Sequence, residues 1–478
     1  MTEEVRKAVQ DYLGSARWFG GKGRGFTVTD VRRLGRVGRV GEPVADVEHD
    51  DPTVVVDLAE VTYDDGDVEL YQVPLALYTE PEARLDHAFV GWWEDPDLGW
   101  THAYDAVHDR GAMARYLAAF ETTDVDGRAD GEGGGVSSRP LRFVRVGDHE
   151  LETDIHSTLF SGEQSNSTVA YGEDAVLKVF RKLTPGENPD ITTHRVLTDS
   201  GSPHVAALYG WVETDAEDGG ILHLAMLQQF LRTASDGWDI ALASVRDLFA
   251  EADLHAEEVG GDFASESARL GTALSEVHQQ LRDAFGTDTL DATTVADTMI
   301  GRLHAAVAVV PQLEEHAERL RGTFRALAGL GQIPVQRIHG DLHLGQTMRT
   351  VVGWKLVDFE GEPAKPLAER LLPDSPWRDV AGMLRSFDYA PHAIARSVEE
   401  DDPDAAAQRE WRADEWAARN KEAFLTTYAG GRGLEPDEGA LVAAYVADKA
   451  VYECVYEARN RPAWLPIPLT AIARIGAP

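Results

Sequence analysis

The spacing of apolar residues changes near residue 230, and this change constrains the fold more than any other feature of the chain. Before it, short apolar runs alternate with turn-forming residues. Residues 53–60 and 68–77, for example, flank a Tyr-Asp-Asp-Gly-Asp sequence typical of a hairpin turn. Beyond residue 230, apolar residues recur every three or four positions, as in amphipathic helices. We therefore expect an α+β chain with a β-rich front, a helical back and a cleft between the two.

The same patterns locate individual elements. The N-terminal residues read as the start of an amphipathic helix, and residues 169–180 as a second hairpin. A stretch rich in Gly and Asp, residues 124–138, is predicted to be a low-complexity connection. Helices are expected over residues 241–249, 265–282, 293–309 and 313–330, followed by a β-like island over 335–359 and by further helices up to Arg459.

Composition excludes several classes of function. The 478 residues contain 45 Lys and Arg against 82 Asp and Glu, a formal net charge of −37 that repels nucleic acid and anionic membranes. No apolar run approaches the roughly 18 residues that a membrane helix needs, and the N-terminus lacks a signal-peptide core, so a cytoplasmic protein is expected. The one cysteine, Cys454, lies in an apolar helical pattern and is predicted to be a buried, unreactive thiol.

The strongest chemical signal is a pair of aspartates. Asp341 lies in HGDLHLGQ and Asp358 follows in LVDFE, a separation that lets a loop and a returning strand bring both carboxylates to one point. Phosphoryl transfer needs such a pair: one carboxylate accepts the proton of the attacking hydroxyl, and the other holds Mg²⁺ against the nucleotide phosphates. Gln346, five residues after Asp341, is placed to complete the metal shell. We interpret His339 and His343 as loop-packing or substrate-orienting groups, because no third ligand at suitable spacing joins them.

Three segments before residue 232 fit a nucleotide site. Lys178 stands inside the apolar sequence AVLKVF, where a lysine is costly unless it is paired, and such a lysine can bind nucleotide phosphates. The loop FSGEQSNS offers small polar residues to phosphates, and residues 224–231 form an apolar strand ending in polar residues where adenine could bind. An edge-strand lysine, a polar turn and a plain strand end are the alternatives. The candidate nucleotide-binding residues are Lys178, Ser161, Gly162, Gln164, Ser165, Gln228 and Phe230.

These motifs resemble those of the maltokinases, which belong to the aminoglycoside-phosphotransferase branch of the protein-kinase-like superfamily. HGDLHLGQ and LVDFEGEP are similar to the catalytic and metal loops, and GEQSN to the phosphate loop. Other similar stretches run from ARWFGGKGR near the start to YEARNRP near the end. The resemblance implies Asp341 as the catalytic base, Gln346 and Asp358 as metal ligands, and ATP and Mg²⁺ as cofactors. Gln346 replaces the Asn usual in the superfamily and matches its sugar-kinase branch.

The resemblance also implies a domain organisation and an activity. It implies a bilobal kinase-like fold with a β-rich N-terminal cap over residues 1–105, an intermediate nucleotide-binding subdomain over 106–230, and a mostly helical lobe over 231–478. The implied reaction phosphorylates maltose to maltose 1-phosphate, with trehalose synthase as a possible partner. The alternatives are a kinase of glucosamine, another sugar or an aminoglycoside on the same fold, and a non-catalytic pseudokinase that acts as a scaffold.

The acceptor site is expected on the last long helical segment. Its tyrosines and polar residues recur every three or four positions and so share a face, and a sugar site needs aromatic surfaces and hydroxyl-binding groups. The alternative is that the tyrosines pack in the core. The residues expected to contact substrate are His343, Glu360, Tyr452, Glu453, Tyr456 and Asn460, and a second candidate wall consists of Trp411, Asp414, Glu415 and Trp416. We interpret Arg378 and Asp379 as bracing residues.

One position departs from the maltokinase pattern. In that family an acidic residue follows the Asn-Pro-Asp-hydrophobic run and could pair with the strand lysine. Here Thr192 occupies the position, and a threonine cannot form the ion pair. Either another acid nearby pairs with Lys178, or nucleotide phosphates alone hold it.

Overall fold

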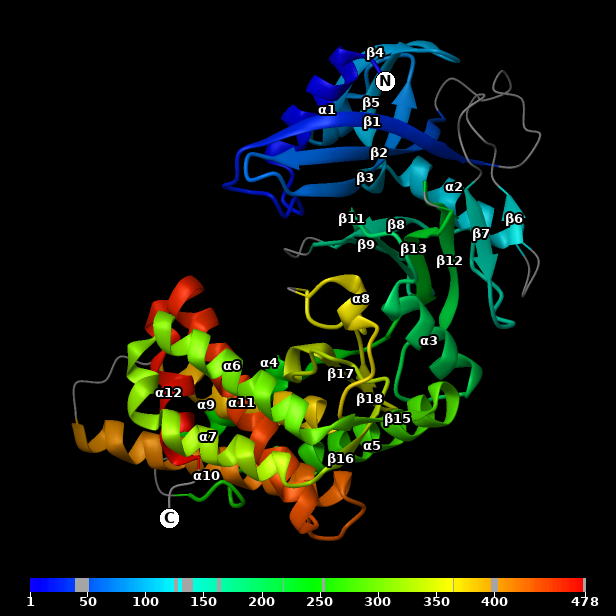
Figure 1. The fold of residues 1–478 in the computed structure, drawn as a ribbon. Helices are drawn as coiled ribbons and strands as arrows, with labels where there is room; N and C mark the ends of the chain where they lie inside the picture. Colours follow the sequence, from blue (N-terminus) through cyan, green and yellow to red (C-terminus); the bar gives the residue numbers. More distant parts are fainter. Residues whose placement is uncertain are drawn as a thin grey trace. The chain divides into compact units, whose positions relative to one another are not determined.

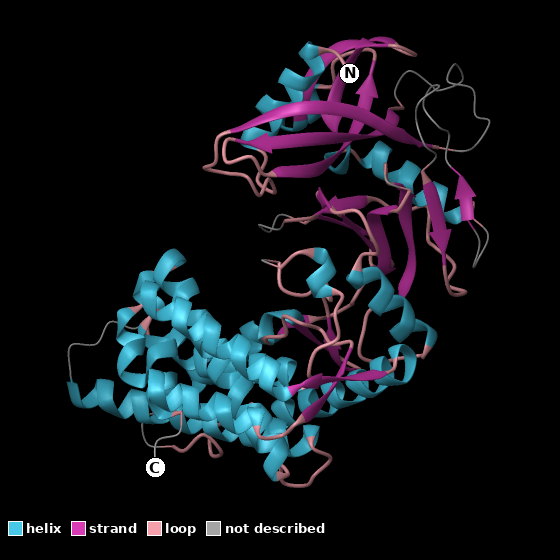
Figure 2. Cartoon of the chain, viewed as in Figure 1, coloured by secondary structure: helices cyan, strands magenta, loops and turns pink. Residues whose placement is uncertain are grey.

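The structure is a computed structural model, and it describes residues 1–38, 51–123, 128–130, 141–160, 165–217, 219–251, 254–363, 365–396 and 403–475. The chain forms two compact units: Met1–Arg195 with Ala206–Arg232, and Val196–Val205 with Thr233–Pro478. The first unit is built mainly of strands and the second mainly of helices (Figures 1 and 2). The α+β class and the change of character near residue 230 are therefore confirmed, whereas the division into three domains stays a prediction.

An antiparallel sheet and one helix form the start of the first unit. Strand order in the sheet is β1-β2-β3-β5-β4, and the short β11 pairs with β3. Helix α1 covers one face, where it buries Val5, Val9 and Leu13. The predicted hairpin is present, with Thr53 opposite Leu77. The bounds are α1 (Glu3–Ser15), β1 (Phe26–Val37), β2 (Thr53–Tyr63), β3 (Val68–Tyr78), β4 (Phe89–Asp95), β5 (Gly99–Asp105) and β11 (Lys182–Leu183).

A second antiparallel sheet completes the unit, in the order β6-β7-β12-β13-β10-β9-β8. The hairpin predicted over residues 169–180 is confirmed as β9 and β10. Two helices in this part of the chain, α2 and α3, were not predicted, and α3 runs from the first unit into the second. The bounds are α2 (Arg110–Glu121), β6 (Arg128–Asp130), β7 (Arg142–Arg145), β8 (Ser157–Leu159), β9 (Ser167–Tyr171), β10 (Ala175–Val179), α3 (Pro189–Asp199), β12 (Leu208–Asp215) and β13 (Ile221–Gln229).

The second unit packs long helices around one apolar core (Figure 1). The four helices predicted between residues 241 and 330 are confirmed as α4 to α7. Helices α9, α10 and α11 contribute buried side chains to the same core, among them Phe387, Phe424 and Val451. The bounds are α4 (Gly237–Ala250), α5 (Ala264–Phe285), α6 (Ala292–Val309), α7 (Glu314–Ala328), α8 (Leu367–Arg370), α9 (Trp377–Ala395), α10 (Pro403–Tyr428), α11 (Pro436–Asn460) and α12 (Pro466–Arg474).

The predicted β-like island lies within this helical unit (Figure 2). Strand β16 pairs with β15, and β17 and β18 form a hairpin that β14 extends. Residues 337–346 connect β16 to β17, and residue 357 follows β18, so these two small sheets carry both aspartate motifs. The bounds are β14 (Ser235–Asp236), β15 (Thr287–Asp291), β16 (Gln332–Gln336), β17 (Thr347–Thr350) and β18 (Gly353–Leu356).

Two further expectations concern single features. Cys454 is buried in the helical core, and burial raises the pKa of its thiol to about 12, so the prediction of a buried, unreactive thiol agrees with the structure. In the described part of the chain, no helix has both the length and the apolar character required to cross a membrane.

Candidate functional site

The two aspartate motifs meet beside the β17–β18 hairpin. The Gln346 side chain donates a hydrogen bond from Nε2 to Oδ2 of Asp358 (3.2 Å), and the backbone N–H of Val357 donates to the Gln346 carbonyl (3.1 Å). The side-chain oxygens of Gln346 and Asp358 are hard ligands of the kind that Mg²⁺ prefers. The structure therefore brings the two predicted metal ligands together.

Asp358 has an unusual backbone conformation. Its φ is 68°, in the left-handed region that few residues other than glycine adopt, although Asp and Asn tolerate it better than most. Gly361, three residues later, also has a positive φ of 73°. The turn after β18 thus directs the Asp358 carboxylate toward Gln346 at some cost in backbone strain, as is common at functional sites.

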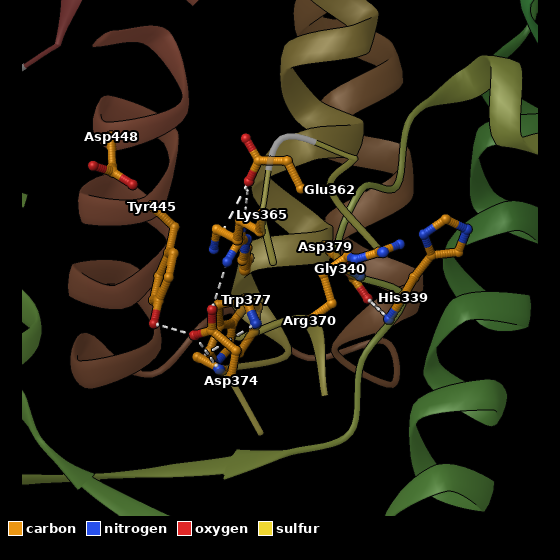
Figure 3. A network of polar contacts seen from close by, with 12 residues as sticks. His339, Gly340, Glu362, Lys365, Arg370, Asp374, Trp377, Asp379, Tyr445 and Asp448 are labelled. Carbon is orange, nitrogen blue, oxygen red and sulfur yellow. Dashed lines mark hydrogen bonds and ion pairs between the residues drawn. The ribbon is translucent and has the colours of Figure 1, made fainter. Parts of the chain in front are cut away.

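Asp379, at the start of α9, holds the loop that carries Asp341. Its carboxylate accepts hydrogen bonds from the backbone N–H groups of His339 (2.7 Å) and Gly340 (2.8 Å), as Figure 3 shows. His278 Nε2, from α5, lies 3.0 Å from the same carboxylate. Burial raises the pKa of Asp379, but hydrogen bonding and charge from His278 outweigh it, so the pKa lies below its usual range. Asp379 is thus placed as a bracing residue.

The two histidines of the loop differ in their surroundings. His339 Nε2 lies 2.9 Å from the Val357 carbonyl and its ring lies 4.7 Å from that of Phe359, so it packs the loop against the strand that leads to Asp358. His343 accepts a hydrogen bond at Nδ1 from the Gly345 N–H (3.1 Å) and lines the pocket described below. Burial lowers the pKa of His343 despite the nearby carboxylate of Asp341, so the ring is neutral at pH 7.

The backbone of helix α9 packs directly against the backbone of the loop that carries Asp341. A Cβ atom added at Gly382 would lie 2.3 Å from the carbonyl oxygen of Leu342, far inside any real contact. The Ser386 hydroxyl, one turn further along the helix, accepts a hydrogen bond from the Leu344 N–H (3.0 Å). The position of Asp341 therefore depends on a glycine that contributes no side chain of its own.

A second brace joins the segment after Asp358 to the helices. The Arg378 guanidinium bridges Asp374 (2.8 Å) and Glu362 (2.7 Å), and the Tyr445 hydroxyl of α11 donates to Asp374 (3.0 Å). Figure 3 shows Glu362, Asp374 and Tyr445 converging in this network. Because Glu362 lies four residues after Asp358, the bridge also fixes the loop of this predicted metal ligand, in keeping with the bracing role expected of Arg378.

A pocket of about 770 Å³ opens beside Asp341. Among the residues that line it, five carboxylates outnumber two cationic side chains, and five large aromatic side chains supply apolar surface. The Tyr452 and Tyr456 rings stack at a centroid distance of 6.4 Å, and the Tyr389 and Trp464 rings at 6.3 Å. The carboxylates belong to Asp236, Asp239, Asp341, Glu453 and Glu457, the cations to Lys449 and Arg461, and the aromatic side chains to Trp238, Tyr389, Tyr452, Tyr456 and Trp464.

The structure assembles most of the predicted acceptor residues here. Asp341, His343, Tyr452, Glu453 and Tyr456 all line the pocket. Glu453 pairs with the buried Arg385 guanidinium (2.7 Å), and burial, only partly offset by this partner, raises the pKa of Glu453. Burial and the carboxylates of Glu362 and Asp341 raise the pKa of Tyr452 to about 12, so its hydroxyl keeps its proton.

Other predicted substrate residues lie elsewhere. The Asn460 amide donates to the Tyr456 carbonyl (2.9 Å) at the end of α11, outside the pocket lining, and the Glu360 carbonyl accepts from Arg370 (3.0 Å). The second candidate wall is not part of the pocket. Trp416 is buried in the core, Trp411 lies against His255, Asp414 pairs with Arg474 and Glu415 with His255.

Sequence reasoning missed several pocket residues. Lys449 Nζ lies 3.3 Å from Oδ1 of Asp341, and Lys449 precedes Tyr452 and Glu453 by three and four residues, so the helical spacing could have identified it. Asp236, Tyr389 and Trp464 come from separate elements and join the pocket only through tertiary packing. No sequence signal that was used points to them.

The first unit contains the candidate phosphate lysine. Lys178 Nζ, on β10, donates to Oδ2 of Asp190 at the start of α3 (2.8 Å), and the buried His194 ring contacts the other carboxylate oxygen (3.0 Å). The acid that pairs with Lys178 is therefore Asp190, two residues before Thr192. Burial raises the pKa of Asp190, but the charges of Lys178 and His194 dominate and hold it well below its usual range.

The other predicted nucleotide-binding residues have contacts that do not indicate a phosphate or adenine site, or lie outside the described residues. Gln228 lies on β13 opposite Val176, and the Phe230 N–H donates to the Asp174 carbonyl (3.0 Å). Ser165 is exposed. Ser161, Gly162 and Gln164 lie outside the described residues, as does most of the connection predicted over residues 124–138.

Comparisons with known proteins point to one group of enzymes. A family profile described as "Maltokinase N-terminal cap domain" matches residues 12–109. A glucosamine kinase of Streptacidiphilus jiangxiensis is 30% identical over 319 residues, covering 64% of this chain and 70% of the relative. A glucosamine kinase of Mycolicibacterium smegmatis is 27% identical over 328 residues, covering 65% and 77%. The solved structure of a glucosamine kinase in complex with glucosamine, ADP and inorganic phosphate is similar in fold over 100% of both chains, with a TM-score of 0.67 and 21% identity.

Proposed function

Since the chain belongs to the glucosamine kinase family, a group of sugar kinases, we propose that it transfers the γ-phosphoryl group of ATP to a hydroxyl of glucosamine. The observation that carries the proposal is the pocket beside Asp341, where carboxylates outnumber cations and aromatic side chains supply flat apolar surfaces. The family relation supports the reaction class, and the pocket supports an acceptor that carries both a sugar ring and a positive charge.

In the proposed reaction Asp341 is the general base. Its carboxylate accepts the proton of the acceptor hydroxyl as that oxygen attacks the γ-phosphorus, a new O–P bond forms, and the bond to the bridging oxygen of ADP breaks. Burial raises the pKa of Asp341, but the charges of Lys449, His343 and His339 lower it by more, so the pKa lies below its usual range. The carboxylate is therefore ionised at neutral pH and able to accept a proton. Asp379 supports this role because it holds the two residues that precede Asp341.

The nucleotide and its metal ion are assigned from donor chemistry. Lys178 is proposed to bind the nucleotide phosphates, and its ion pair with Asp190 supports the assignment because it holds the ammonium in one position. Gln346 and Asp358 offer adjacent oxygen ligands and would hold Mg²⁺. When bound, the ion would neutralise phosphate charge, whereas the chain's own residues orient the acceptor and take up its proton.

Maltose is the second candidate acceptor. The match of residues 12–109 to the maltokinase cap profile favours it, as do the two stacked aromatic pairs, which offer surfaces for two sugar rings. The cap itself does not discriminate between the acceptors, since the glucosamine kinase structure covers the whole of this chain, residues 12–109 included. Three of the five pocket carboxylates pair with cations, Glu453 with Arg385, Glu457 with Arg461 and Asp341 with Lys449. The negative charge of the other two, Asp236 and Asp239, is what ranks the amino sugar first.

A direct assay decides between these acceptors. Purified protein is incubated with ATP and Mg²⁺ and with glucosamine, maltose, glucose or kanamycin, at several salt concentrations because of the net charge of −37. ADP release is followed with a coupled enzyme assay, and the product is identified by ³¹P NMR. Glucosamine phosphate as the preferred product is the expected result. Preference for maltose overturns the acceptor, and nucleotide binding without turnover on any sugar overturns the kinase assignment in favour of a scaffold.

A further inference from the structure

Lys449 occupies the pocket directly beside the proposed base. Its ammonium lies 3.3 Å from Oδ1 of Asp341, and its side chain is 31% exposed, so the charge faces the space an acceptor would fill. The sequence motifs give this lysine no task, and the proposed reaction uses it only as one of three charges that lower the pKa of Asp341. It is also one of only two cationic side chains among the described residues that line the pocket.

The lysine is held in place from its own helix. Lys449 Nζ lies 5.1 Å from the centroid of the Tyr452 ring, within the range of a cation–π contact. Lys449, Tyr452 and Glu453 lie one turn apart on the face of α11 that lines the pocket, and the core buries Ala450 and Val451 beside them. The ammonium is thus fixed relative to Asp341 by a well-packed helix.

We propose that Lys449 is a positioning residue for Asp341: it keeps the carboxylate ionised and directed into the pocket while an acceptor is present. This inference rests on the proposed function, since it assigns a task to a neighbour of the proposed base. Lys449 acts through Asp341 and takes no part in the proton transfer itself.

The charges around Asp341 explain why a neighbouring cation matters for its role as a base. A carboxylate that loses water on burial becomes easier to protonate, and a protonated Asp341 cannot accept the acceptor's proton. Burial does raise the pKa of Asp341, and the charge of Lys449 is the largest opposing influence, ahead of His343 and His339. The groups that act on Asp341 include Lys449 and Tyr452 from α11 and the two histidines of its own loop. The carboxylates of Asp236, Asp239 and Glu453 line the same pocket from β14, α4 and α11.

A purely structural role of Lys449 would predict a different effect of its substitution. A partly exposed lysine–carboxylate pair such as Lys449–Asp341 contributes little to the free energy of unfolding. If Lys449 only braced the fold, its loss would change stability slightly and leave the pH dependence of catalysis as it is. A change in that pH dependence therefore separates the two roles.

The test uses Lys449→Met and Lys449→Arg in the full chain. For Lys449→Met we expect kcat to fall about 10- to 100-fold, with the KM for ATP little changed. On the acid side, the fall of kcat/KM should begin at a higher pH than in the wild type, because Asp341 protonates more easily without the lysine. Lys449→Arg should restore most of kcat and the wild-type acid limb. Lys182→Met is the matched control, since Lys182 pairs with Glu69 (2.5 Å) in the other unit and lines a different pocket.

A measurement that does not depend on turnover completes the test. The Asp341 carboxyl resonance is followed by ¹³C NMR through a pH titration in the wild type and in Lys449→Met, with Asp341→Asn to assign the signal. A higher pKa in Lys449→Met supports the inference. An unchanged pKa with unchanged kinetics overturns it. Wild-type protein that is inactive on every sugar removes the proposed function instead, and the titration still decides whether Lys449 controls the ionisation of Asp341.

Discussion

The Lys178 ammonium on β10 lies 2.8 Å from the carboxylate of Asp190 at the start of α3, and this pair fixes the candidate phosphate lysine to a helix. Both side chains are mostly buried, with exposed fractions of 14% and 2%. A buried charge that loses its partner is strongly destabilising, because the remaining ion has no compensation for its lost hydration.

Asp190→Asn should therefore weaken both the fold and nucleotide use. We expect the free energy of unfolding to fall by about 3 kcal/mol at pH 7, and the KM for ATP to rise about tenfold, because Lys178 is no longer held in position. Denaturant titration and steady-state kinetics measure the two effects. Thr192→Ala is the matched control from the same helix and should leave both quantities close to wild type.

The same pair sets a pH dependence. The pKa of Asp190 is lowered in the folded protein, mainly because Lys178 and His194 outweigh burial. Its contribution to stability is thus fully present above the unfolded pKa of about 4 and is lost as the pH falls through the lower folded value. The stability difference between wild type and Asp190→Asn should be largest near neutral pH and shrink below pH 4. A difference that grows on acidification contradicts the assignment.

Asp341→Asn tests the proposed base. The amide preserves the size of the side chain but cannot accept a proton, so we expect kcat to fall at least about 1,000-fold. Nucleotide affinity, measured by isothermal titration calorimetry, should change little because the base contacts the acceptor rather than ATP. Near-normal turnover in this variant removes Asp341 from the mechanism.

Asp358→Asn and Asp358→Ala together test the metal site. Asn tolerates the left-handed backbone conformation found at Asp358 (φ 68°), whereas Ala adds backbone strain to the loss of the carboxylate. Both variants should lose the Mg²⁺-dependent part of ATP binding, and Asp358→Ala should also melt at a lower temperature. Titrations with and without Mg²⁺ that match the wild type show that the ion is held elsewhere.

Tyr456→Ala tests the acceptor wall. Loss of an aromatic surface that stacks on a sugar ring should raise the KM for the acceptor about tenfold while leaving the KM for ATP unchanged. Trp411→Ala is the control, since Trp411 is an exposed aromatic residue that does not line the pocket. An equal effect of both substitutions indicates that Tyr456 has no special relation to the acceptor.

The sequence predicted the parts of the site that local patterns encode. The separation of Asp341 and Asp358 predicted that their two loops meet, and Gln346 and Asp358 do lie together because the residues between them form one hairpin, whose geometry a short sequence determines. Their role as metal ligands stays a prediction. The helical spacing of Tyr452, Glu453 and Tyr456 predicted a common face because an α-helix has a fixed period. Asn460 shares that period but sits at the last residue of α11, where its amide bonds the helix end instead.

Contacts between segments that are distant in the sequence were not predicted, because a local pattern does not encode them. Asp190 was not recognised as the partner of Lys178 because α3 falls in a region interpreted as strands, and only the helix start brings Asp190 to β10. Trp416 was predicted to belong to a second wall of the acceptor pocket, yet α10 buries it against Phe263 and Phe387. A pattern within one segment states which residues share a face, but not what that face meets.

Gly382 has a consequence for protein engineering. The contact between α9 and the Leu342 carbonyl leaves no room for even one methyl group at residue 382. The distance between the Asp341 loop and the helix therefore depends on the absence of a side chain at this position. A combinatorial library aimed at a new acceptor should keep residue 382 invariant, although it touches no reacting group. Diversity is better placed at the exposed Tyr452 and Tyr456 of α11, with Lys449 and Glu453 kept, because these two side chains can change without displacing the backbone that supports the chemistry.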